Sequence, residues 1–169
     1  LGIPASMIVK TTEDNFWIAG TSGPCGPDTE IFYFRSDDEV PEYYDLDDDR
    51  WVEIWNNVFM QYYKDQNSIS ELSQKNVDTG MGIERTTAIL EGVNDNYLSS
   101  IWTNIIKKIE EISGLTYAGN EKSMRIIADH LRTAVFISAD PAGIKPSNTD
   151  QGYILRRLIR RAIRHARNL

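Results

Sequence analysis

Residues 77–85 read Val-Asp-Thr-Gly-Met-Gly-Ile-Glu-Arg, and the rest of the chain is interpreted around them. Gly80 and Gly82 carry no Cβ, so the backbone can turn closely beneath a ligand. A helix that begins near Ile83 would offer free N–H groups to an anion, with Asp78 before the turn and Arg85 after it. The pattern is typical of a nucleotide-facing edge, although many glycine-rich junctions between strand and helix are simple turns.

The chain ahead of this turn has the period of a sheet. Residues 51–63 predict a strand whose two faces are both largely apolar, so it should be central, and Asn56 and Val58 share one of these faces. Residues 69–74 should return antiparallel toward residue 78. Residues 30–34 predict another short strand.

Two other stretches ahead of the turn are predicted as loops. The Gly- and Pro-rich residues 15–27 suit a loop that packs beside a ligand rather than an element of a sheet. The acidic residues 36–49 suit solvated surface.

After Leu90 the hydrophobic period changes to that of helices. An apolar stripe over 97–112 predicts a first helix, which Gly114 ends. A second stripe over 124–138 includes Leu131 and Val135. A third helix should begin near Asp150, with six residues on its apolar side: Ile154, Leu155, Leu158, Ile159, Ala162 and Ile163.

Charge is distributed unevenly along the 169 residues, although the total is −7. Residues 1–120 hold 8 Lys/Arg against 21 Asp/Glu, whereas residues 121–169 hold 10 against 4. The basic second part is therefore a candidate for contact with nucleic acid. No apolar run approaches the roughly 20 residues of a membrane span, and Cys25 is the only cysteine, so we expect a cytoplasmic protein without membrane contact.

Several stretches together resemble a known family. Residues 80–85 resemble motif 3 of the class II aminoacyl-tRNA synthetases, and residues 77–79 make the match similar to the alanyl-tRNA synthetase family. The other matching stretches follow in the order of that family: 14–17, 23–27, 53–61, 127–132, 146–148 and 152–157. Motifs 1 and 2 of the class have no counterpart here, so we expect a segment cut from a longer enzyme.

The resemblance implies activation of alanine by ATP, followed by transfer to alanine tRNA. It implies catalytic roles for Asp78, as the ammonium-binding residue, and for Arg85, which would contact the γ-phosphate. The alanine pocket it implies comprises Trp17, Asn56, Val58, Asp78 and Gly80. ATP would be bound by Gly82, Glu53 and Arg85, with Glu53 helping to hold Mg²⁺. Without the resemblance, Trp17 and Val58 would be interpreted as core and Arg85 as a surface residue.

Zinc is not expected. Many bacterial members carry two cysteines and two histidines with zinc-ligand spacing, whereas here Cys25 is followed by Asp28, and Arg35 and Asp38 replace the histidines. We predict no metal site in the chain itself. His130 and His165 are interpreted as a packed residue and a surface residue.

The basic third helix is predicted to bind the acceptor stem of alanine tRNA. The resemblance assigns Asn148 to the G·U wobble pair, and the arginines would meet phosphates: Arg156, Arg157, Arg160, Arg161, Arg164 and Arg167. Many relatives have an arginine before Gly152, where this chain has Gln151. The alternative is that these arginines pair with the acidic first part of the chain.

We therefore predict an α+β fragment. Residues 1–90 would be the end of an antiparallel class II catalytic sheet, and residues 91–169 the start of a helical tRNA-recognition domain. The fragment alone would be inactive. A rival interpretation is an RNA-binding module that keeps the fold without the reaction.

Overall fold

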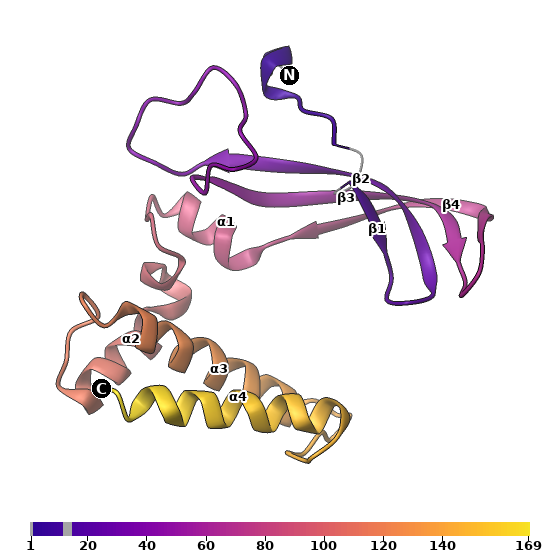
Figure 1. The fold of residues 1–169 in the computed structure, drawn as a ribbon. Coiled ribbons are helices and arrows are strands. Elements are labelled where there is room, and N and C mark those ends of the chain that lie inside the picture. Colours follow the sequence, from indigo (N-terminus) through magenta and orange to yellow (C-terminus); the bar gives the residue numbers. More distant parts are fainter. Residues whose placement is uncertain (1, 12–14) are drawn as a thin grey trace. The chain divides into compact units, whose positions relative to one another are not determined.

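The computed structural model describes residues 2–11 and 15–169, and Asp14 of the matching stretch 14–17 lies outside the described residues. The chain divides into two compact units, Leu1–Asn94 and Asp95–Leu169 (Figure 1). The first holds a four-stranded antiparallel sheet and the second is helical. The prediction of an α+β fold is confirmed.

The sheet is built from consecutive antiparallel strands. Their order in space is their order in sequence: β1 (Phe16–Ile18), β2 (Gly23–Phe34), β3 (Trp51–Lys64) and β4 (Ile69–Met81). The single-turn helix η1 (Ala5–Met7) precedes them, and α1 (Ile83–Leu90) follows β4 directly. As predicted, β3 has a neighbour on each side and α1 begins at Ile83.

The prediction that residues 15–27 form a loop is wrong, because they supply β1 and the beginning of β2. The surroundings of Gly26 show why this strand contains a glycine. A Cβ on Gly26 would lie 1.9 Å from the carbonyl oxygen of Phe59, so only glycine lets β3 approach this closely. The register shifts between Cys25 and Asp28, which accommodates Pro27 without a ladder hydrogen bond.

The acidic loop between β2 and β3 is tied down at its end. Arg50 forms ion pairs with Asp38 and Asp48 at 2.8 and 2.7 Å, and its guanidinium lies over the ring of Phe34. Phe34 also packs against Trp51. The loop is therefore irregular, as predicted, but anchored to the sheet.

The second unit packs three helices after the short turn η2 (Asn96–Leu98). They are α2 (Ser100–Ser113), α3 (Glu121–Ala139) and α4 (Asp150–Ala166), with α3 in contact with both others. Gly114 has a φ of 72° and ends α2, as predicted. The core consists of Trp102, Ile106, Tyr117, Met124 and Ala128.

Part of the predicted helical stripes does not face this core. Leu131 and Val135 on α3 are 44% and 64% exposed, and Ile154 and Ile163 on α4 are about half exposed. These residues have the same helical spacing as the buried ones, but the neighbouring helices of this unit cover only part of the apolar side of α3 and of α4.

Asp95, Tyr117 and Arg125 form a polar cluster that ties the start of this unit to α3. The Tyr117 hydroxyl and Arg125 Nη2 each donate to Asp95 Oδ2 at 2.5 Å, and Arg125 Nε donates to the Tyr117 hydroxyl at 2.7 Å. Burial raises the pKa of Tyr117 to about 12, so its hydroxyl remains a donor at neutral pH.

Candidate active site and nucleic-acid interface

The pairing of β3 with β4 brings four predicted site residues together. Asn56 lies opposite Gly80, and Val58 lies opposite Asp78. Directly opposite residues in an antiparallel pair share a face, so all four lie on one face of the sheet. Val58 is 6% exposed and forms the floor, whereas Asp78 is exposed.

Two carboxylates on β2 extend this face and were missed from the sequence. Asp28 lies opposite Val58, and Glu30 lies opposite Asn56. Asp28 is buried and accepts a hydrogen bond from Asn15 Nδ2 at 3.1 Å, while Asn56 Nδ2 lies 3.5 Å from Glu30 Oε1. The face therefore carries three carboxylates around one amide. Only the strand register, which sequence reasoning did not supply, identifies them.

Gly80 leaves the middle of this face uncovered. A Cβ built on Gly80 has no atom within 4 Å, so packing within the chain does not require glycine there. A side chain at this position would stand beside Asn56, its cross-strand neighbour. Glycine thus keeps the amide of Asn56 accessible.

Trp17 is not brought to the same four residues by strand pairing. It lies on β1 opposite Gly26, and β2 separates β1 from β3.

Arg85, Glu53 and Gly82 meet where β4 gives way to α1. Arg85 Nη1 donates to Glu53 Oε2 and to the Glu53 carbonyl oxygen, both at 3.0 Å. Gly82 is the N-cap of α1, and a Cβ there would lie 3.2 Å from Arg85 Cδ. Glycine at this position therefore lets the arginine side chain lie across the start of the helix.

The described residues contain no group of three or more His, Cys, Asp or Glu side chains placed to hold a metal ion. Cys25 is fully buried, which does not suit a zinc ligand at the surface.

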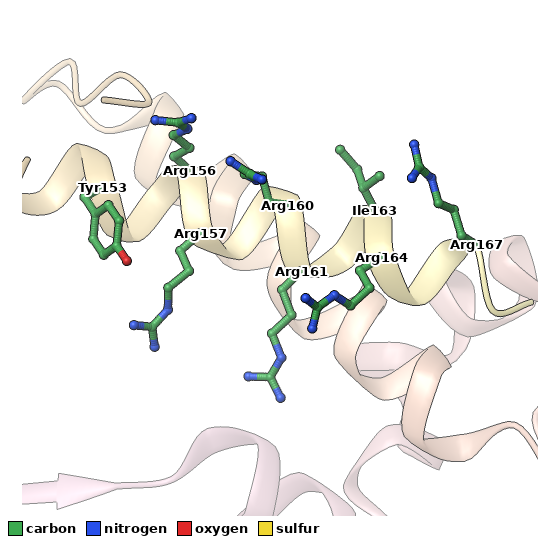
Figure 2. A pocket seen from close by; sticks show the side chains of 8 residues that line it. All are labelled: Tyr153, Arg156, Arg157, Arg160, Arg161, Ile163, Arg164 and Arg167. Atoms are coloured by element: carbon green, nitrogen blue, oxygen red, sulfur yellow. The ribbon is translucent and has the colours of Figure 1, made fainter. Parts of the chain in front are cut away.

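The arginines of α4 line an open pocket together with Tyr153 and Ile163 (Figure 2). Arg156 and Arg160 project from one side of the helix, and Arg157 and Arg161 from the other. Arg156 is half-buried, whereas the remaining arginines of the set are exposed. Within residues 95–169, none of them forms an ion pair with a carboxylate. Both sides of α4 therefore present cationic groups that have no carboxylate partner within this unit.

The loop before α4 is closed onto the first turn of that helix. Ser147 N–H donates to the Gly152 carbonyl oxygen at 3.0 Å, and Ser147 Oγ donates to the Thr149 carbonyl oxygen at 2.7 Å. A Cβ on Gly152 would lie 2.4 Å from both Lys145 O and Ser147 Oγ. Ser147 and Gly152 belong to stretches that match the family, but sequence reasoning assigned them no role. In the structure they fix the backbone that carries Asn148.

His165, predicted as a surface residue, is partly exposed and lies beside α3. It is half-buried on α4, and Ser123 Oγ on α3 lies 3.2 Å from its Nδ1. Burial, together with Arg161, Lys122 and Arg164, lowers the pKa of His165, so the imidazole adds no charge to the arginine face at neutral pH. His130 is buried, as predicted, and contacts Asp129.

Comparison with known proteins identifies the class. The family model "tRNA synthetases class II (A)" matches residues 1–169, so the chain belongs to that family. Curated relatives carry the name alanine–tRNA ligase. The chain is 54% identical to the protein of Treponema denticola over 93% of its length, 49% identical to that of Borrelia hermsii over all of it, and 50% identical to that of Rickettsia massiliae over 99%.

The chain spans only 27%, 30% and 20% of the length of these three relatives.

Across the described residues, the structure has no helix long and apolar enough to cross a membrane.

Proposed function

We propose that the chain is part of an alanine–tRNA ligase, termed here the parent ligase, which activates alanine with ATP and transfers it to alanine tRNA in the cytoplasm. Residues 1–90 would belong to its catalytic domain and residues 91–169 to its tRNA-recognition domain. The observation that carries the proposal is the β3–β4 register, which sets Asn56 against Gly80 and Val58 against Asp78.

This face suits a small amino acid with a positive charge. The ammonium group of alanine would meet a negatively charged surface formed by Asp78 together with Asp28 and Glu30. Its methyl group would rest on Val58, whose apolar side chain forms the floor. Gly80 leaves room for the substrate above Asn56. Trp17 would close the pocket, as the family resemblance implies.

ATP would lie beyond Gly80 toward the start of α1. Arg85 would exchange its contact with Glu53 for the γ-phosphate, because a planar guanidinium binds phosphate oxygens in pairs. The backbone at Gly82 would approach the nucleotide. Glu53 would then be released to help hold Mg²⁺. A single carboxylate suits this ion, because proteins bind Mg²⁺ through one or two carboxylates together with substrate phosphates. Bound Mg²⁺ would offset charge on the phosphates.

Alanine activation needs position and charge rather than a protein nucleophile. The side chains of Asp78 and Asn56 orient the amino acid, so that its carboxylate is held near the α-phosphate. Arg85 stabilises the negative charge that develops on the phosphates as the bond to pyrophosphate breaks. The acceptor stem of tRNA would be bound by α4 and the loop that carries Asn148.

The test is Asp78→Ala in the parent ligase. Loss of the carboxylate should lower kcat/KM for alanine by about two orders of magnitude in alanine-dependent exchange of pyrophosphate with ATP. The affinity for ATP should remain. Glu71→Ala is the matched control, because Glu71 is an exposed carboxylate on the same strand. Unchanged alanine kinetics in Asp78→Ala would overturn the assignment, and absence of exchange in the parent ligase itself would favour the non-catalytic RNA-binding module.

A further inference from the structure

Arg156 differs from its neighbours on α4, although the sequence presents it as one arginine of a set. It is the half-buried member, and Arg156 Nη1 donates a hydrogen bond to Asn148 Oδ1. Arg157, the next residue, is exposed and projects from the other side of the helix (Figure 2). The contact joins a residue of the helix to the residue of the loop that was assigned to base recognition.

The backbone beneath this contact is fixed independently. Ser147 and Gly152 close the loop onto α4, and Asp150 has a φ of 51°, a left-handed conformation that is strained for a non-glycine residue. Such strain persists only where surrounding contacts impose it. Asn148 therefore stands on a rigid backbone, and its remaining freedom is rotation of the side chain.

The chemistry of the guanidinium decides how that side chain is oriented. Arginine only donates hydrogen bonds, so Asn148 must present its oxygen, and not its amide nitrogen, to Arg156. The amide nitrogen then points outward with two N–H groups. Asn148 in this orientation is a donor toward any partner of the loop.

From this geometry we propose that Arg156 is a positioning residue, which holds Asn148 so that its amide donates to an acceptor atom on a base edge. The inference rests on the proposed function, in which Asn148 distinguishes a G·U from a G·C pair. Both pairs expose acceptors at purine N3 and pyrimidine O2 in the shallow minor groove of an RNA helix. Wobble pairing displaces the pyrimidine of G·U relative to that of G·C, so an amide donor held in one place can reach the acceptor of one pair and not of the other. Arg157, Arg160, Arg161 and Arg164 bind phosphates in this scheme, and Arg156 sets specificity.

The first experiment measures charging by the parent ligase of tRNA with G·U and tRNA with G·C at the same position. Arg156→Met should lower the ratio of kcat/KM for G·U over G·C by about tenfold. Asn148→Ala should lower this ratio equally, and combining Arg156→Met with Asn148→Ala should lower it no further. Arg156→Gln, which keeps an N–H donor without the charge, should retain most of the ratio. Arg157→Met is the matched control and should lower kcat/KM for both tRNAs by the same factor, so that their ratio is unchanged.

Asn148→Asp tests the donor. It keeps an oxygen for Arg156 but has no N–H group, so discrimination should be lost as fully as in Asn148→Ala. Retained discrimination in Asn148→Asp, or an equal effect of Arg156→Met on both tRNAs, would overturn the proposal.

A second experiment separates this contact from the proposed function. In ¹⁵N-labelled 169-residue chain, the side-chain amide signals of Asn148 should shift on Arg156→Met and not on Arg157→Met. If they shift while Asn148→Ala leaves the G·U ratio unchanged, the base-reading role fails and the contact stands. If Arg156→Met leaves the signals in place, the positioning role fails whatever the charging assays give.

Discussion

Arg85 Nη1 lies 3.0 Å from Glu53 Oε2, so the two side chains predicted to meet ATP and Mg²⁺ are partners of each other. Both are partly exposed, at 46% and 35% of the side chain, so the pair contributes little to stability. It instead keeps Arg85 extended across Gly82 at the start of α1. The arginine is thereby held ready at the position where the proposed phosphate would arrive.

Replacing Arg85 in the parent ligase should therefore affect ATP rather than folding. Arg85→Ala should lower kcat/KM for ATP in pyrophosphate exchange by about a hundredfold, because one charged donor to the reacting phosphates is lost. Arg85→Lys should recover only part of this, since an ammonium cannot make the paired contact. Lys75→Ala, which removes an exposed cation on β4, is the control. Equal activity of Arg85→Ala and Lys75→Ala would remove Arg85 from the ATP site.

The 169-residue chain by itself should not activate alanine. The family resemblance places many ATP contacts on motif 2, and no stretch within residues 1–169 resembles that motif. Exchange of pyrophosphate with ATP on the purified chain should stay at background with and without alanine, measured beside the parent ligase. Robust alanine-dependent exchange would show that this chain holds a complete site.

The purified chain should contain no stoichiometric zinc. Its one cysteine, Cys25, is buried, and one thiolate cannot complete a four-ligand site. Elemental analysis after dialysis provides the measurement. One zinc per chain would contradict the prediction and would require carboxylate ligands, to be sought among Asp28, Asp37 and Asp38.

Asp95 should stabilise the second unit in a pH-dependent way. Burial alone would raise the pKa of Asp95, but hydrogen bonds from the Tyr117 hydroxyl, the Tyr97 N–H and Arg125 outweigh it and hold the pKa below the usual 3.8. A lowered folded-state pKa contributes stability above pH 3.8 that is lost as the pH falls through the folded-state value. Asp95→Ala should therefore reduce the free energy of unfolding by roughly 1.5–3 kcal/mol at pH 7.

The measurement is denaturant unfolding of both proteins at pH 7 and at several values below pH 4. The difference between wild type and Asp95→Ala should shrink across the acid range. Glu111→Ala is the control, since its exposed pair with Lys108 is worth only about 0.3–0.5 kcal/mol. A difference that stays constant with pH would mean that the carboxylate charge is not what stabilises the cluster.

Local patterns in the sequence predicted part of this site, and long-range pairing supplied the rest. Alternation along residues 51–63 suffices to put Asn56 and Val58 on one face, because strand period is a local property. The residues opposite them depend on register. That register is shifted between Ile31 and Phe32 on β2 and between Met60 and Tyr62 on β3, and nothing local encodes these irregularities. Asp28 and Glu30 were therefore missed.

The same limit explains the error over residues 15–27. Glycine and proline are the strongest local signals of a loop. Here Gly26 is needed because another strand passes within contact of its backbone, a constraint imposed by β3. On α4, the helical period predicted the arginine row, but the contact of Arg156 with Asn148 depends on a loop that folds back over Gly152.

Removing one phosphate-binding arginine should weaken tRNA binding without changing its sequence preference. Arg160 is exposed on α4, and it lines the pocket with the other arginines. Each phosphate contact adds about 0.7–0.9 to the slope of log affinity against log salt, because bound phosphates release counterions. In the parent ligase, Arg160→Ala should therefore reduce that slope by about one and lower the affinity for G·U and G·C acceptor stems alike. Lys108→Ala, which removes an exposed cation from α2, should leave both slope and affinity unchanged. If Arg160→Ala leaves the slope unchanged while Lys108→Ala lowers it, the RNA lies on α2 rather than along α4.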